Sequence, residues 1–187
     1  MSPTMQAPDT DLDRVIAAAL AEFERWLLES GWHGKENACV NLCAHGFLFK
    51  RIRPGGAIQD FTQVGIEVFV PQLKTRNSKV AVRKDLVVWD KPSGVTWSDA
   101  WQPTRPPCAI IEWKARRKAR RAPLLDENDL DWLRRYSLRY PGFVGYAVTV
   151  DFTGSSSRIA SARIRSGEIA EEFHRQLKTE SGLESQS

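Results

Sequence analysis

Two apolar runs decide the fold: AVRKDLVVW at residues 81–89 and CAIIEWKA at residues 108–115. Both are rich in β-branched residues, a composition typical of strands that are covered on both faces. Each run nevertheless carries charge, with Asp85 in the first and with Glu112 and Lys114 in the second. Residues two apart on a strand share a face, so Glu112 and Lys114 are expected to project together. Buried charge costs free energy unless it is paired or bound to metal, which makes these residues the first candidates for a site.

The same charges have a simpler interpretation. A Glu-x-Lys pair can be the solvated face of an antiparallel sheet, and an Asp at the entrance of a strand is often a turn residue. If the two strands are neighbours, however, Asp85 joins Glu112 and Lys114 on one surface. Two carboxylates beside an ammonium group suit a hard cation and hydrolytic chemistry on a phosphate.

The rest of the chain predicts a single α/β domain. Helical periodicity indicates helices over residues 10–30, 35–50 and 126–140, and a further short helix from Gly167 to about residue 177. Strands are expected at about 63–70, 80–89, 108–115 and 143–152, with an added edge strand at 158–165. We expect residues 1–9 and 179–187 to be disordered tails, which leaves residues 10–178 as the domain.

Asp85 and the Glu112-Trp113-Lys114 triplet, in this order on successive expected strands, resemble the PD-(D/E)xK nuclease superfamily. The resemblance covers roughly residues 34–152, with Lys84 where the name-giving Pro would stand. It implies a restriction-endonuclease-like αβββαβ core, a central mixed sheet flanked by helices, with an extra N-terminal helix here. It also implies metal-dependent phosphodiester hydrolysis of nucleic acid, with DNA as the expected substrate. The alternative is an inactive nuclease-fold module that binds nucleic acid or a protein partner.

The resemblance assigns roles to these residues. Asp85, Glu112 and Lys114 would be catalytic. Asp85, Glu112 and the Trp113 carbonyl would hold Mg²⁺ or Mn²⁺. The helix before the first core strand often adds a glutamate in this superfamily, and Glu36 is the position that fits.

Two further glutamates have open alternatives. Glu36 begins the inward face of its helix, because apolar residues follow it at i+4, i+7 and i+11. The helix dipole alone could equally favour a glutamate there. Glu67, on the first expected strand, is a secondary candidate whose alternative is a salt bridge to Arg83 or Lys84. Glu22 and Glu24 on the first helix are weaker candidates.

Positive charge is concentrated directly after the triplet. The chain has a net charge of +4, and residues 114–121 read KARRKARR, six basic residues in eight. A basic run is usually a solvated surface, but here it begins at Lys114. We therefore predict that it binds nucleic-acid phosphates through the side chains of Arg116, Arg117, Lys118, Arg120 and Arg121. The resemblance also allows a homodimer.

Other classes of protein find little support. The chain has no P-loop, GxGxxG motif or nucleophile elbow. No apolar run is long enough to span a membrane, so we expect no membrane partner. Three cysteines are a low and odd number, which argues against a disulfide framework and favours a reducing cytoplasm. Cys39, Cys43 and His45 lie close in sequence, but no second ligand pair accompanies them, so buried thiols are expected rather than zinc.

Overall fold

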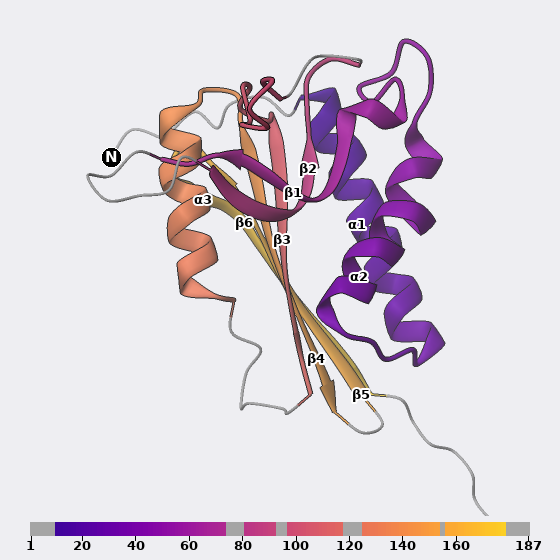
Figure 1. The fold of residues 1–187 in the computed structure, drawn as a ribbon. Coiled ribbons are helices and arrows are strands. Elements are labelled where there is room, and N and C mark those ends of the chain that lie inside the picture. The colour runs from indigo at the N-terminus through magenta and orange to yellow at the C-terminus, as the bar shows by residue number, and fades with distance from the viewer. Residues whose placement is uncertain (1–9, 74–80, 93–96, 118–124, 154–155, 179–187) are drawn as a thin grey trace, which may run out of the picture.

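The computed structural model describes residues 10–73, 81–92, 97–117, 125–153 and 156–178 (Figure 1). The predicted tails at 1–9 and 179–187 lie outside these ranges. The described strands form one six-stranded mixed sheet in chain order, β1-β2-β3-β4-β5-β6. Their bounds are β1 (Val64–Pro71), β2 (Ala81–Val88), β3 (Ala109–Arg116), β4 (Val144–Thr153), β5 (Ser156–Arg165) and β6 (Glu168–Lys178). The predicted α/β class with a mixed sheet is thus confirmed.

Helices cover both faces of the sheet (Figure 1). α1 (Asp11–Ser30) and α2 (Glu36–Cys43) pack on one face, and α3 (Glu127–Arg139) packs on the other. α2 continues through a π-helical turn at Ala44–Leu48 and a 3₁₀ turn at Phe49–Arg51, which together fill the predicted helix. α3 connects β3 to β4, and these two strands are parallel, whereas the other neighbouring strands are antiparallel. A crossover helix is the connection that a parallel pair requires.

β1 and β2 change the face that they present halfway along. Ile66 and Leu86 pack on the α1 and α2 side, whereas Val68 and Val82 pack on the α3 side. In regular strands these positions, which are separated by even numbers of residues, would all lie on one face of the sheet. Glu67 lies at the change with a φ of 53°, a left-handed conformation that is uncommon for a residue with a side chain. The kink places Lys84, which pairs with Val68, on the α3 side as well.

The predicted C-terminal helix is wrong. Residues 168–178 form β6, which pairs antiparallel with β5 across a two-residue turn. Ser166 and Gly167 occupy that turn with φ values of 48° and 84°, as a type I′ hairpin turn requires. Pairing with the exposed edge of β5 therefore overrides the helical propensity of this Glu-rich segment. Within the described ranges no helix has the length and apolar character needed to cross a membrane.

Candidate functional site

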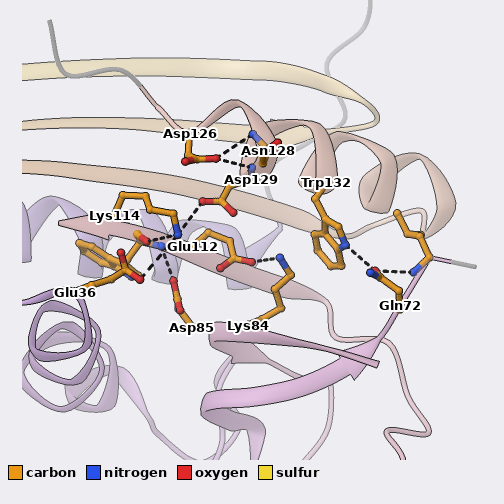
Figure 2. A network of polar contacts seen from close by, with 12 residues as sticks. Glu36, Gln72, Lys84, Asp85, Glu112, Lys114, Asp126, Asn128, Asp129 and Trp132 are labelled. Atoms are coloured by element: carbon orange, nitrogen blue, oxygen red, sulfur yellow. Dashed lines mark hydrogen bonds and ion pairs between the residues drawn. The ribbon is translucent and has the colours of Figure 1, made fainter. Parts of the chain in front are cut away.

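The site forms where β2 and β3 stop pairing. Only three residue pairs join these strands, and Leu86 with Ile111 is the last of them towards the site. The backbone N–H of Trp113 lies beyond this point and donates instead to Asp85 Oδ2 at 2.8 Å (Figure 2). The Asp85 carboxylate thus takes the place of the backbone carbonyl of β2 that would accept this hydrogen bond in a continuous sheet. The Asp85 side chain fits between β2 and β3 because the two strands are no longer paired here.

Glu112 is buried in an ion pair with Lys84. The two side chains are only 5% and 6% exposed, and Lys84 Nζ contacts Glu112 Oε1 directly. Lys84 Nζ also lies 3.8 Å from the ring centroid of Trp132 on α3, a cation–π contact. Gln72 fixes that ring by accepting a 2.8 Å hydrogen bond from its indole N–H. One buried cation is therefore held between a carboxylate on the sheet and an aromatic ring on a helix.

Lys114 connects the sheet to both helix layers. Its ammonium lies 3.3 Å from Asp129 Oδ2 on α3 and 3.9 Å from Glu36 Oε1 on α2. It also donates to the backbone carbonyl of Trp113 at 3.1 Å. Burial opposes the charge on Lys114, but Asp129 and Glu36 outweigh this effect, and the net result raises its pKa. Lys114 consequently stays cationic at neutral pH.

The carboxylates of the site crowd one another. Burial raises the pKa of Glu112 to about 7; Lys84 opposes this rise, and Asp85 and Asp129 add to it. Burial likewise raises the pKa of Glu36, with further increases from Asp85 and Asp129. Burial also raises the pKa of Asp129 against the lowering effect of Lys114. The repulsion felt by Glu112 and Glu36 places Asp85 within electrostatic reach of both.

The donor set suits a divalent hard cation in chemistry and charge. Four carboxylates face two ammonium groups, which leaves a formal charge of −2 when all are ionised. Carboxylate and carbonyl oxygens are the ligands that Mg²⁺ and Mn²⁺ prefer. In the part of the chain that the structure describes, however, no three acidic, His or Cys side chains are gathered tightly enough to hold an ion. Lys84 contacts one carboxylate oxygen of Glu112, and Lys114 contacts the Trp113 carbonyl oxygen.

The other predicted residues lie elsewhere or in simpler roles. Glu67 pairs with Arg83, the alternative considered for it. Glu22 pairs with Arg51, and Glu24 is buried against Ser161. Arg116 and Arg117 end β3 and follow it, while Lys118, Arg120 and Arg121 lie outside the described residues.

The thiols do not form a metal site among the described residues. Cys39 and Cys43 are buried and free. Burial raises the pKa of Cys39 to about 12 and raises that of Cys43 as well. Protonated buried thiols match the expectation from the sequence.

The sequence interpretation missed Asp129, Trp132 and the role of Lys84. Asp129 did carry a signal: Trp132, Leu133 and Tyr136 follow it at i+3, i+4 and i+7, so it extends the buried stripe of α3. Glu36 was found on the same grounds. Lys84 could not be found in this way, because the kink at Glu67 turns it towards α3 against the alternation of its strand.

Comparison with known proteins adds no assignment. No family model matches the chain, and neither curated proteins nor solved structures give a significant match.

Proposed function

We propose that the chain is a metal-dependent phosphodiesterase of the PD-(D/E)xK type that hydrolyses nucleic acid, with DNA as the expected substrate. One observation carries the proposal: Asp85 and Lys114 both bind the Trp113 backbone where β2 and β3 diverge, and the adjacent Glu112 is buried in an ion pair with Lys84. The element order α2-β1-β2-β3-α3-β4 is also that of a restriction-endonuclease-like core. An ordinary solvated strand face does not account for Glu112, which is 5% exposed.

In this proposal Asp85, Glu112 and the Trp113 carbonyl would hold Mg²⁺ or Mn²⁺, with Glu36 as a direct or water-bridged ligand. Such an ion would polarise the scissile phosphate and lower the pKa of a bound water. Lys114 orients the attacking water or offsets the negative charge that develops on the phosphate. Asp129 holds the Lys114 ammonium at the edge of the site, 3.3 Å away. Lys84 contacts Oε1 of Glu112, so the carboxylate would bind the ion through Oε2, or through Oε1 after Lys84 moves away.

A second function is favoured by the same ion pair. If Lys84 stays on Glu112, the carboxylate is neutralised in place and the fold is a binding module without activity. The basic residues after Lys114 would then still hold nucleic-acid phosphates or an acidic partner. The two functions share one surface and differ in the availability of Glu112.

A cleavage panel separates them. Single- and double-stranded DNA and RNA are incubated with the protein in Mg²⁺, Mn²⁺ or EDTA, and products are resolved by length. The nuclease proposal expects cleavage in metal that EDTA abolishes. Asp85→Asn and Lys114→Met should each lose it, whereas Lys50→Met, an exposed lysine outside the site, should not. Binding of the same substrates without cleavage under every condition would instead support the binding module.

A further inference from the structure

A basic cavity adjoins the candidate site. It has a volume of about 420 Å³ and is lined by His33, Gly34, Lys35, Arg117 and Phe152. Three of these side chains can carry positive charge, and no carboxylate lines the cavity among the described residues. His33 packs its ring edge against Phe152, with centroids 5.2 Å apart and the planes at 66°. The cavity thus joins exposed cations to an aromatic wall, the combination used to hold nucleic-acid strands.

The cations of this cavity are available for a ligand. Among the residues that the structure describes, neither Lys35 nor Arg117 has a carboxylate partner. A second cavity of about 420 Å³ differs, because Asp11 lines it and two of its three arginines are paired, Arg14 with Asp11 and Arg51 with Glu22. Unpaired cations that converge from separate segments attract an anion at little cost, since no existing ion pair must be broken.

Two residues that line this cavity lie close in sequence to residues of the candidate site. Lys35 directly precedes Glu36, whose carboxylate faces Lys114. Arg117 follows Lys114 by three residues, about 10 Å along the direction of β3. Arg117 is therefore near enough to Lys114 along the chain for both residues to contact one bound strand.

We propose that the cavity binds a backbone phosphate of a nucleic-acid strand, next to the phosphate held at Lys114. Lys35 and Arg117 contact the phosphate, and the exposed ring of His33 stacks on the adjoining base. The inference rests on the proposed function in one respect, that the neighbouring site is where the strand is cut. Phosphate binding by the cavity does not itself require cleavage.

The test measures binding in EDTA, where no cleavage interferes. A fluorescein-labelled 12-mer of thymidine is titrated with the protein at several salt concentrations. The Lys35→Ala/Arg117→Ala double variant should weaken binding at least tenfold at low salt. It should also flatten the log–log salt slope by up to about 1.4, since each lost contact to a single strand contributes about 0.7. The matched control is Lys50→Ala/Arg53→Ala, which removes the same charge from exposed positions elsewhere.

Each outcome decides the proposal. A slope that falls in the first pair and not in the control supports it. A slope unchanged in both pairs overturns it, because the cavity then contributes no phosphate contact. A slope reduced equally in both pairs also overturns it, because only the net charge would then matter. Thymidine 5′-monophosphate that competes as well as the 12-mer would also overturn it, in favour of a site for free nucleotides. Cleavage is assayed separately: a cavity effect without cleavage refutes the proposed function alone, and cleavage without a cavity effect refutes the cavity alone.

Discussion

Substitution of Glu112 by Gln should remove a pH dependence from the stability of the metal-free protein. Burial in the folded state raises the pKa of Glu112 from its ordinary value of 4.5 to about 7. Between these values the unfolded chain has lost a proton that the folded protein retains, so the free energy of unfolding falls as pH rises. A difference of about 2.5 units at 1.36 kcal/mol each corresponds to roughly 3 kcal/mol, lost between about pH 4.5 and pH 7.

The assay is urea unfolding in EDTA at pH 5, 6, 7 and 8, followed by tryptophan fluorescence. The wild type should lose about 2.5 kcal/mol relative to Glu112→Gln from pH 5 to pH 8, since part of the loss occurs below pH 5 and since Glu36 and Asp129 titrate in both proteins. Glu168→Gln, at an exposed position on β6, serves as the control and should follow the wild type. Parallel pH curves for the wild type and Glu112→Gln would refute the burial argument. Added Mg²⁺ should reduce the loss in the wild type only.

Three further predictions concern neighbouring residues. Lys84→Met should lower the free energy of unfolding of the metal-free protein at pH 8 by about 3–5 kcal/mol, because it leaves the buried Glu112 carboxylate without its cation. The same variant should bind Mn²⁺ more tightly in a calorimetric titration. Unchanged stability would contradict the ion pair. Asp85→Ala should cost about 1–3 kcal/mol in urea unfolding because the Trp113 N–H loses its acceptor, whereas Asp85→Asn should keep the stability, and equal losses would argue against that hydrogen bond. Replacing the four arginines of the basic run with Ala should flatten the slope of log affinity against log salt concentration for duplex binding, by up to about 0.9 per lost phosphate contact. An unchanged slope would exclude contacts to the nucleic-acid backbone by these residues, which are Arg116, Arg117, Arg120 and Arg121.

The sequence predicts the central strands well because their pattern is strong. Apolar β-branched runs around Leu86 and Ile111 allow no competing assignment, and the helical stripe of α3 is equally clear. β6 was missed because its pairing with β5 is a tertiary effect that local propensity does not carry. Such a segment adopts a strand only because the open edge of a sheet lies beside it.

The site was predicted in part for the same reason. Glu112 and Lys114 share a face by strict alternation, which one strand alone determines. The contact between Glu112 and Lys84 depends instead on a left-handed residue, Glu67, on the neighbouring strand. A non-glycine residue at positive φ has no reliable sequence signal, so the pairing of the two buried charges could not be anticipated.

Lys84 determines which of the two proposed functions the site can perform. A cation that binds Oε1 of Glu112 must first displace this lysine, and breaking a buried pair costs about 3–5 kcal/mol. At 1.4 kcal/mol per tenfold, that cost weakens the apparent affinity for metal by roughly two to three and a half orders of magnitude. Trp132 reduces the penalty in one respect, because its ring holds the Lys84 ammonium 3.8 Å away and can keep it while Glu112 turns to another partner. A nuclease that binds its metal through this oxygen therefore requires the cation–π contact to retain Lys84 after the ion pair opens, whereas a binding module requires only that the pair stay closed.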